Sequence, residues 1–507
     1  MAVREGVDEG SQVETYAGKI TVKWNHDAAV TPFGQLVYFV EFLKTAGLWE
    51  SFVKDCPVRY ESPNAPSKAD MLGTILLSVL AGHKRYAHIS ALRFDGVNPQ
   101  LLGMNKTCSE DSIRRAFQSV DESECASWLE RHLRASYAPL LTEPWILDID
   151  TTVKPLYGHQ EGAVKGYNPG KPGRPSHAYH TYFAANIRLV LDVEVQPGNQ
   201  TASSHAQPEL WKFIDGLAAE ARPAFIRGDC GWGTERMMAE AEQRRIPYLF
   251  KLKQTAKVKQ LIGQAFKRED WTDAGQGFKG VEAELMLTGW TRKRRVIVLR
   301  RAITDEAVLA AKRKRLAACS PEQQLDLGFV EPVKDGPIYE YAVLVTTLPD
   351  EILTLAQHYR ERAGAENNFD ELKNQWGWGS FTTQELAHCR LMARMVAPVY
   401  NCWTLFVRLA QPHKHFEAIS SWPLLLHGVA TQHAGHTRLT ITSLHAKQAA
   451  IQAVLTSLAG FLSTLNATAE QWTDADRLRA IRARAFAKFM LTTTGPPALP
   501  TSETTAI

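Results

Sequence analysis

The sequence predicts an α/β fold in which a mixed β-sheet lies between helical N-terminal and C-terminal regions. Three observations support this prediction. Apolar side chains recur at helical spacing from about residue 33 to 136, residues 144–252 alternate between strand-like runs and helices, and residues 386–490 return to helical spacing. Because 507 residues exceed the size at which one hydrophobic core keeps growing, about two to four domains are expected.

The domain boundaries are expected where these patterns change. A helical N-terminal domain is expected over residues 1–140, and an α/β domain over residues 141–380. A β-rich insertion over residues 254–338 is expected to interrupt the α/β domain. A helical C-terminal region follows over residues 381–490, and the Thr, Pro and Ala residues of 491–507 predict a disordered tail.

Composition describes an ordinary soluble globular protein, with 45% hydrophobic and 22% charged residues. The net charge of +4 is only mildly basic, so a polyanionic partner would have to be held by local patches. Such basic patches occur at residues 251–268, 292–295, 312–315 and 477–488. Each of them is equally typical of a solvated surface face.

A cytoplasmic protein without a membrane partner is expected. The seven cysteines are scattered and show no C-x-x-C spacing, which indicates reduced thiols rather than a disulfide framework or a zinc site. The first twelve residues contain four charged side chains and no apolar run typical of a signal peptide. The longest apolar stretch, around residues 71–81, is far shorter than the ~20 residues that a membrane helix needs.

The N-terminal domain is expected to be helical after a polar, loosely ordered start of about 30 residues. Ser67 and Ser109 are candidate N-caps, because a serine hydroxyl can accept a hydrogen bond from the first helical turn. Short helices with a basic pair at Arg114 and Arg115 fit either a DNA-reading module or a plain helical bundle. The expected helices cover residues 33–53, 67–80, 110–117 and 122–136.

The central domain is expected to contain strands and helices in the order β-β-β-α-β-α-β. This order is typical of a ribonuclease-H-like mixed sheet. A strand at residues 339–346 and a long helix that opens at Asp350 are expected after the β-rich insertion. The seven elements are expected at residues 145–150, 178–185, 188–195, 207–221, 224–227, 234–244 and 248–252.

Two carboxylates follow predicted strands of this domain. Asp150 is expected at the end of the first strand, where the site would open; Asp148 lies on the same face and stays an alternative. Asp229 lies among glycines in the sequence IRGDCGWG, which let the backbone approach a ligand or simply turn into the next helix. Because Thr234 can cap that helix by itself, Asp229 is available for function.

Four polar residues share one strip of the long helix: Tyr359, Arg362, Glu366 and Lys373. Their offsets of 0, 3, 7 and 14 fall within about 60° in helical projection. With Asp370 one turn beyond Glu366, the strip also fits a solvent-facing ion-pair ladder worth only ~0.3–0.5 kcal/mol per pair. Three carboxylates beside a basic and aromatic strip are what metal-assisted phosphodiester chemistry requires.

The order Asp150, Asp229 and Glu366, with Tyr359-x2-Arg362-x3-Glu366-x6-Lys373, resembles the DDE transposases of bacterial insertion sequences, in the branch with a Tyr-Arg-Glu-Lys signature. The strings LDIDTTV, YGHQEGA and GYNP between residues 147 and 169 are similar to the thirteen-eighty family of insertion sequences. The resemblance covers residues 30–490 in outline. Its specific motifs occupy residues 145–180, 225–235 and 355–380.

The resemblance implies a role for each residue of these motifs. Asp150, Asp229 and Glu366 would be the catalytic triad and hold two Mg²⁺ ions, or Mn²⁺ in their place. Arg362 and Lys373, together with Tyr359, would contact phosphates at the transposon end; Arg362 suits bidentate contact and Lys373 acts as a point charge.

Relatives of this branch also carry a β-strand insertion between the second Asp and the Glu. Roughly 135 residues separate them here, more than an ordinary connection needs. In some relatives an aromatic side chain of the insertion stabilises a flipped base, for which Trp290 and Trp271 are candidates. The glycine- and proline-rich loop at residues 158–175 is either a phosphate-gripping loop or a polar surface loop; its basic residues are Lys165, Lys171 and Arg174.

The activity implied by the resemblance is cut-and-paste DNA transposition. The N-terminal domain would bind terminal inverted repeats, and the protein would cleave strands and join the freed 3′-OH ends to target DNA. A homodimer is expected to pair two ends, in a bacterial cytoplasm and on the nucleoid when bound. The alternatives are a stand-alone metal-dependent ribonuclease-H-like nuclease and a non-catalytic DNA-binding protein derived from a transposase.

Overall fold

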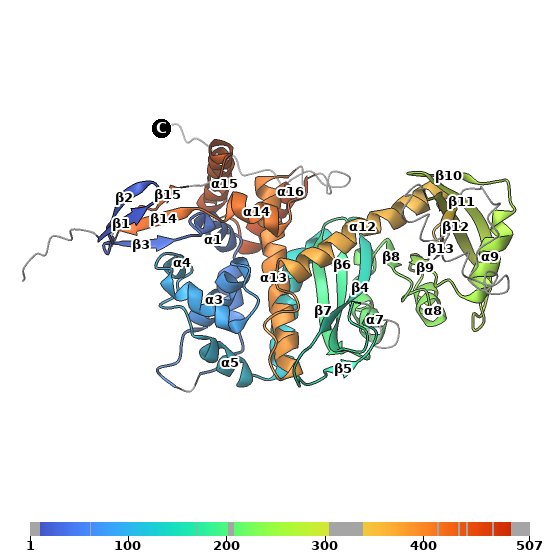
Figure 1. Cartoon of the computed structure of the whole chain (residues 1–507), viewed down its shortest axis with the longest axis horizontal. Helices are drawn as coiled ribbons and strands as arrows, with labels where there is room; N and C mark the ends of the chain where they lie inside the picture. Colours follow the sequence, from blue (N-terminus) through green and yellow to red (C-terminus); the bar gives the residue numbers. More distant parts are fainter. Residues whose placement is uncertain are drawn as a thin grey trace, which may run out of the picture.

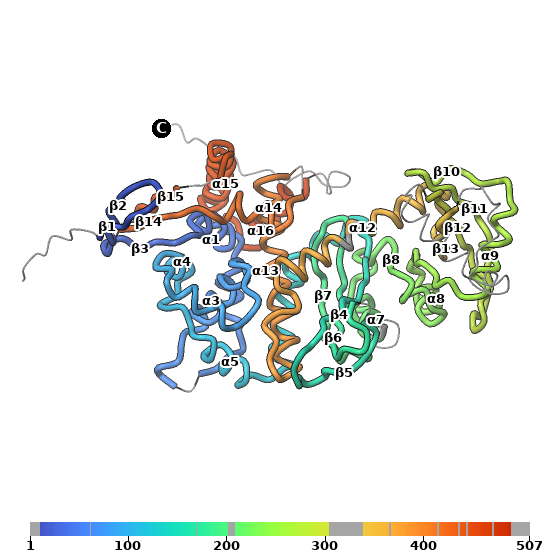
Figure 2. The backbone as a smooth tube through the Cα atoms, viewed as in Figure 1, coloured from blue at the N-terminus to red at the C-terminus, as the bar shows by residue number. Residues whose placement is uncertain are grey.

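A computed structural model of the chain describes residues 11–60, 62–168, 170–200, 207–303, 338–412, 415–433, 437–442, 445–468 and 471–487. The expected tail at 491–507 and the basic patch at 312–315 lie outside the described residues. The molecule is elongated, with a helical body at one end, a sheet in the middle and further strands at the other end (Figures 1 and 2). The long helix α12 (Ile352–Asn374) runs between the two ends.

The elements of the central sheet follow one another in the predicted order, with the two helices α7 (Gln207–Asp215) and α8 (Glu235–Gln243) between strands. In space the strands run β7-β6-β4-β8-β9. The β4 strand is antiparallel to β6 and parallel to β8, and β8 is parallel to β9. The five strands are β4 (Ile146–Pro155), β6 (Pro175–Ala184), β7 (Leu189–Pro197), β8 (Phe225–Gly228) and β9 (Tyr248–Lys251).

The insertion extends this sheet rather than forming a separate one. The strand that follows the insertion, β13 (Tyr339–Thr346), pairs antiparallel with β12 on one side and with β9 on the other. The described sheet therefore has ten strands, in the order β10-β11-β12-β13-β9-β8-β4-β6-β5, with β7 also paired to β6. The remaining members are β5 (Val164–Lys165), β10 (Thr272–Gly275), β11 (Phe278–Leu285) and β12 (Arg294–Ala302), with the helix α9 (Ala256–Phe266) before them and the short turn η4 (Ala219–Ala221) before β8. The continuous buried runs of β12 (Val296 to Leu299) and β13 (Val343 to Thr346) match a sheet that is covered on both faces there.

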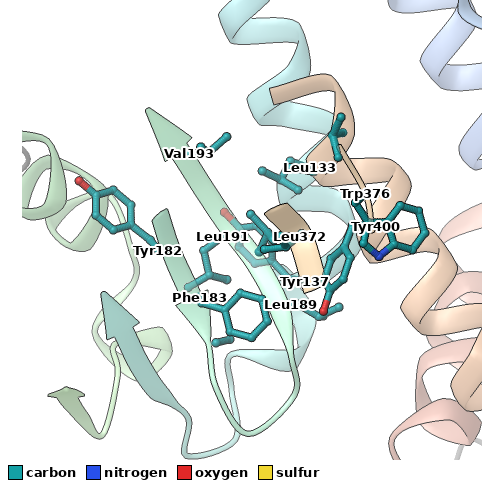
Figure 3. Packing of buried hydrophobic residues seen from close by; sticks show 14 of the residues in the cluster. Leu133, Tyr137, Tyr182, Phe183, Leu189, Leu191, Val193, Leu372, Trp376 and Tyr400 are labelled. Atoms are coloured by element: carbon teal, nitrogen blue, oxygen red, sulfur yellow. The ribbon is translucent and has the colours of Figure 1, made fainter. Parts of the chain in front are cut away.

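The two faces of the sheet contribute to different cores. Leu147 and Ile149 of β4 belong to the main core, whereas Phe225 of β8 belongs to a second core beneath the first half of α12. Leu355 of α12 is fully buried in that second core, and Leu372 near the other end of α12 is fully buried in the main core. Figure 3 shows this end of α12, where Leu372 and the nearby Trp376 lie among side chains of β6, β7, α6 (Glu122–Tyr137) and α13 (Leu386–Ala410).

The N-terminal helices form at the expected places, with one break. The helix expected over residues 33–53 is two helices, α1 and α2, because Gly47 has a left-handed φ of 63° and lies against Asp474. Ser67 caps α3 in a capping box with Asp70, and Ser109 caps α5. The elements are α1 (Leu36–Thr45), α2 (Leu48–Asp55), α3 (Lys68–Leu80), η1 (Tyr86–Phe94), α4 (Asn98–Leu101), α5 (Glu110–Gln118), α6 (Glu122–Tyr137) and η2 (Ala138–Leu140).

An entirely helical N-terminal domain is wrong for residues 11–31. These residues form the hairpin β1 (Ser11–Thr15) and β2 (Gly18–Val22), followed by β3 (Ala28–Thr31). The β3 strand pairs with β14 (Val429–His433), which in turn pairs with β15 (Thr440–Thr442). The partner strand lies near the other end of the chain, so the local pattern around residue 30 could not reveal it.

The N-terminal and C-terminal helical regions form one helical body (Figure 1). The Nε atom of Arg477 donates a hydrogen bond to the carbonyl of Thr45 at 2.9 Å, and Arg482 donates to the carbonyl of Ala135. These arginines of the 477–488 basic patch therefore join two parts of the protein. The C-terminal helices are α13 (Leu386–Ala410), α14 (Ala418–Leu425), α15 (Gln448–Ala467) and α16 (Asp474–Ala485).

The described helix α15 has, by length and composition alone, what a membrane-spanning helix needs. Its row of leucines, which includes Leu455, Leu458 and Leu462, is buried, and α15 contacts α1, α13 and α14. The opposite side of α15 is exposed and consists mainly of Gln, Ala, Ser and Thr residues.

Side chains of α13 form hydrogen bonds with backbone groups of the edge strand β7. The amide group of Asn401 donates to the carbonyl of Val190 and accepts from its N–H, both at 2.9 Å. Arg390 donates to the carbonyl of Val195 at 2.9 Å, one of three arginines of α13 that bond to this segment. Side chains of one helix thus protect a sheet edge that would otherwise be open to another strand.

One buried carboxyl of β7 makes stability depend on pH. Burial raises the pKa of Glu194 to about 8, and Asp192 and Glu209 add to the rise more than Arg394 and Lys212 offset it. In the unfolded chain this pKa lies near 4.5, so folding binds a proton and stability falls as pH rises from about 4.5 to 8. We expect Glu194→Gln to raise the free energy of unfolding at pH 8.5 by on the order of 2 kcal/mol, and so to raise the thermal midpoint there, and to change both little at pH 5.

Differential scanning fluorimetry across this pH range checks the expectation. Glu220→Gln is a suitable control, because Glu220 is an exposed carboxyl on the same domain. If wild type and Glu194→Gln lost stability equally between pH 5 and pH 8.5, the buried carboxyl would not be the cause.

Candidate active site

Asp150 and Asp229 lie side by side at the end of the parallel ladder between β4 and β8. The last paired residues are Ile149 of β4 and Gly228 of β8, and the two aspartates come directly after them. The side chain of Asp150 is 25% exposed, and Asp229 is partly exposed and accepts a hydrogen bond from the Gly231 N–H at 2.8 Å. Parallel pairing therefore brings together two carboxylates that are far apart in sequence.

The expected end of the first strand at Asp150 is wrong. The β4 strand does not end at Asp150 but continues to Pro155, paired with β6 throughout. What ends just before Asp150 is the pairing with β8, whose last pair is Ile149 and Gly228. Asp150 and Asp229 each follow this pair directly, so they occupy corresponding positions at the end of the ladder.

Asp148 forms a buried ion pair with Arg227. Its two oxygens accept hydrogen bonds from Nε and Nη2 of Arg227 at 2.5 and 2.7 Å, and neither side chain reaches solvent, with exposures of 0% and 2%. Burial raises the pKa of the Asp148 carboxyl, and the hydrogen bonds and charge of Arg227 offset part of that rise. Of the two aspartates on this strand face, Asp150 is the one that solvent reaches.

The middle of α12 lies over these carboxylates. Nη2 of Arg362 is 3.5 Å from Oδ1 of Asp150, and Arg362 is only 5% exposed. Burial lowers the pKa of Arg362, but Asp150, Tyr359, Asp148 and Asp229 together raise it by more, so the guanidinium stays charged. A solvent-facing ion-pair ladder is therefore wrong for Arg362.

The other members of the strip occupy different surroundings. Tyr359 packs partly buried against the second core, and Lys373 is exposed. Glu366 lies in α12 one turn after Arg362, but its side chain is outside the described residues. Asp370 is exposed and accepts a hydrogen bond from the Asn374 amide at 2.6 Å, an ordinary contact between successive helical turns.

The donor atoms fit a hard divalent cation such as Mg²⁺, which prefers carboxylate oxygens. Asp150 and Asp229 supply such oxygens from rigid strands, and a third carboxylate would come from α12. Within the described part of the chain, no three His, Cys, Asp or Glu side chains are gathered at one point. The Glu366 side chain lies outside the described residues, so this absence does not bear on a site formed by Asp150, Asp229 and Glu366.

A hollow of about 390 Å³ opens beside the strip, between α12 and the strands of the insertion. The guanidinium of Arg301 lies 4.6 Å from the centre of the Phe278 ring and that of Arg360 lies 5.8 Å from it. Glu340 pairs with Arg301 at 2.6 Å. The lining residues include Lys251, Phe278, Arg301, Tyr341, Tyr359, Arg360 and Arg362.

The loop after β4 gathers two of its three predicted basic residues. Lys171 donates a hydrogen bond to the hydroxyl of Tyr157, and the Lys171 Nζ and Arg174 Cζ atoms lie 5.0 and 4.7 Å from the centre of its ring. Lys165 lies in the short strand β5 and is exposed. The Tyr157 side chain is 66% exposed, so this cluster faces solvent.

Trp290, one of the two tryptophans that are candidates for stacking on a base, is buried. Trp290 is 7% exposed, and the guanidinium of Arg294 lies 5.2 Å from the centre of its ring. Arg294 pairs with Glu235 and Glu242 of α8 at 2.5 and 2.8 Å. The ring of Trp290 is thus covered by Arg294, and a stacking role for Trp290 stays a prediction.

The basic patch at residues 292–295 is largely neutralised by acidic neighbours. Arg292 and Arg294 pair with carboxylates of α8, and Arg295 pairs with Glu282 at 2.7 Å. We therefore interpret this patch as part of the packing of the insertion.

The other tryptophan candidate, Trp271, is covered by Arg300, whose Cζ atom lies 3.8 Å from its ring centre.

Comparison with known proteins places the chain in a family. The family model described as "Transposase DDE domain group 1" matches residues 28–461, a span that contains both aspartates and the whole of α12. The chain belongs to this family of DDE transposases.

Other comparisons add little to this assignment. No curated protein matches the transposase. A piggyBac transposase synaptic complex with hairpin DNA, solved by cryo-electron microscopy, is similar with a TM-score of 0.35 and 10% sequence identity, over 90% of this chain and 87% of that chain. A likeness this weak carries no argument about the present chain.

The sequence interpretation of the transposase missed Arg227. A charged residue within the fully buried strand β8 was the available signal, because a buried guanidinium requires a partner. In the parallel ladder Arg227 lies opposite Asp148, the residue that sequence alone could not separate from Asp150.

Proposed function

We propose that this DDE transposase is the cut-and-paste enzyme of a bacterial insertion sequence of the thirteen-eighty family. The observation that carries the proposal is the β4–β8 register, which sets Asp150 beside Asp229 beneath the part of α12 that holds Arg362 and Glu366. The strand order β7-β6-β4-β8-β9, with one antiparallel and one parallel half, supports a ribonuclease-H-like catalytic domain.

In the proposed site each side chain has a separate task. Asp150, Asp229 and Glu366 would hold two Mg²⁺ ions, which supply the activation of the attacking oxygen and the stabilisation of the leaving oxygen. Arg362 would bind phosphate oxygens through its planar guanidinium and neutralise their charge in a nearly dry setting. Tyr359 and Lys373 would fix the position of neighbouring phosphates.

The nucleophile changes between the two reactions. Water attacks the phosphodiester in cleavage, and the freed 3′-hydroxyl attacks target DNA in joining, so no covalent bond to the enzyme is formed. The DNA would lie across the hollow beside α12 and the solvent-facing cluster of Tyr157, Lys171 and Arg174, with Lys165 close in sequence. The proposed partners are the terminal inverted repeats, target DNA and a second copy of the chain that pairs two ends.

The proposal is tested with purified protein, a duplex bearing the end sequence of the element, a target plasmid and Mg²⁺. We expect cleavage at the end and a joined product in which the 3′ end is linked to the plasmid. Omission of the divalent cation, with EDTA present, should abolish both products. Cleavage without any joined product would instead favour a stand-alone nuclease.

A further inference from the structure

The middle of α12 is held to the sheet by polar contacts. Leu355 and Ala356 anchor the helix in the second core, and Phe369 and Leu372 anchor it in the main core. Between these apolar anchors, Tyr359 packs against the second core and the His358 ring lies against that of Phe225, while hydrogen bonds join the His358 carbonyl to Arg227 and the Arg362 guanidinium to Asp150. The position of the intervening segment therefore depends on hydrogen bonds as well as on packing.

Arg227 joins three elements through its guanidinium. Two of its nitrogens donate to the Asp148 carboxylate of β4 at 2.5 and 2.7 Å, and Nη1 donates to the backbone carbonyl of His358 in α12. The ring of Phe225, two residues before Arg227, lies 5.1 Å from the His358 ring. We call the contact of Asp148, Arg227 and the His358 carbonyl the Arg227 clamp.

The Arg227 clamp lies directly behind the proposed site. Asp148 precedes Asp150 by two residues on the same face of β4, Arg227 precedes Asp229 by two residues on β8, and His358 precedes Arg362 by one helical turn. Each clamp member is thus rigidly connected to a member of the site. A movement of His358 would be passed through the helix to Arg362 and Glu366, because an α-helix is stiff over such a distance.

We propose that Arg227 is a positioning residue that sets the height of α12 over Asp150 and Asp229. The proposal rests on the proposed function, since the helix position matters for catalysis only if α12 supplies the third carboxylate and the phosphate contact. Arg227 touches neither substrate nor metal in this scheme. It acts through the His358 carbonyl and the Asp148 carboxylate.

Stability alone does not explain a buried ion pair at this place. Apolar residues of similar volume often replace such a pair with no loss of stability, because burying two charges offsets most of their attraction. An apolar pair, however, cannot donate a hydrogen bond to the carbonyl of His358. A displacement of about 1 Å in a catalytic group can lower a rate by about 10²-fold. Loss of a hydrogen bond that positions the helix can therefore lower the cleavage rate strongly.

The test replaces the ion pair by an apolar pair, Arg227→Met with Asp148→Leu. We expect the thermal midpoint to stay within about 3 °C of wild type. Affinity for end DNA should stay within about 2-fold, whereas the single-turnover cleavage rate should fall by about 10–100-fold, as for loss of a supporting residue behind a metal ligand. A double variant that cleaves at the wild-type rate would overturn the proposal.

The control is an ion pair of the same chemistry away from α12. Arg244, the residue directly after α8, pairs with Asp215 of α7, with both guanidinium–carboxylate contacts at 2.9 Å. Arg244→Met with Asp215→Leu should leave the cleavage rate unchanged. If this control lowered the rate as much as the clamp variant does, the effect would not be specific to α12.

Arg227→Lys keeps the positive charge and covers the case in which the apolar pair fails to fold. A lysine has one compact ammonium group in place of the planar fork, so it cannot contact Asp148 with two nitrogens and also reach His358. We expect this variant to fold and to cleave about 10-fold more slowly. Wild-type cleavage by Arg227→Lys would argue against a positioning role.

Hydrogen exchange separates failure of the clamp from failure of the proposed function. In the protein without DNA or metal, backbone amides of residues 359–366 should exchange at least about 3-fold faster in a folded clamp variant than in wild type. Unchanged exchange would overturn the clamp even if the enzyme is a transposase. Faster exchange in a chain that never cleaves end DNA would support the clamp and reject the function.

Discussion

Asp150→Asn is expected to lower the rate of strand cleavage by more than 10²-fold while the protein stays folded. The substitution removes one carboxylate charge from the proposed metal site, and loss of even an outer-shell partner of a metal ligand lowers activity or affinity by roughly 10–100-fold. Because the Asp150 side chain is 25% exposed and lies 3.5 Å from the Arg362 guanidinium, the loss of stability should be smaller than that of Asp148→Asn. A gel assay with end-bearing duplex and Mg²⁺ measures the rate.

Asp370→Asn is the matched control for this experiment. It removes a carboxylate from the same helix as Glu366, one turn further on, where the side chain is exposed and bonded to Asn374. We expect it to cleave within about 2-fold of wild type, because a surface contact of this kind contributes little. Loss of cleavage in Asp370→Asn but not in Asp150→Asn would show that the site has been placed on the wrong residues.

Asp148→Asn is expected to produce the opposite result, a large loss of stability. The neutral amide would leave the guanidinium of Arg227 buried without its counter-charge, and breaking a buried ion pair in this way costs about 3–5 kcal/mol. That is a large fraction of the roughly 5–15 kcal/mol by which a domain is stable. The drop should be visible as a lower thermal midpoint and as earlier unfolding in urea.

The two asparagine variants control for each other, since they lie two residues apart on one face of β4. A folded, stable Asp148→Asn protein that has lost cleavage, beside an active Asp150→Asn protein, would identify Asp148 as the metal ligand. The buried ion pair would then have to open in the active protein.

The elements with strong local patterns could be predicted from the sequence. The strand before Asp229 is a short apolar run that ends in turn residues, β4 begins with an apolar run that leads to Asp150, and α12 carries a long polar strip, so these elements begin close to their expected places. Ser67 and Ser109 show the same for helix starts, because a cap depends only on the residues of one turn.

Features that depend on distant partners could not be predicted. The β3 strand pairs with β14, and β13 joins the insertion to the central sheet through β9. The chemistry of Arg227 depends on Asp148, which lies opposite it only once β4 and β8 are paired. The break at Gly47 likewise depends on the approach of Asp474 from α16.

The surroundings of the candidate site residues also depend on partners that are distant in sequence, so they could not be predicted. Helical spacing showed that Tyr359, Arg362 and Lys373 share a strip, but only the fold shows that Arg362 is buried against Asp150 while Lys373 stays exposed. The burial of Trp290 also depends on its neighbours in the fold, because Arg294 covers the ring and is itself held by Glu235.

The most direct measurement of the central claim is an excision assay, in which wild type and Glu366→Gln act on a marked element flanked by its own ends in the presence of Mg²⁺. If α12 supplies the third metal-binding carboxylate, wild type should excise the element and Glu366→Gln should bind the ends with unchanged affinity but excise at least 10²-fold more slowly. Excision by Glu366→Gln at the wild-type rate would contradict the claim and would leave a DNA-binding protein derived from a transposase as the better description.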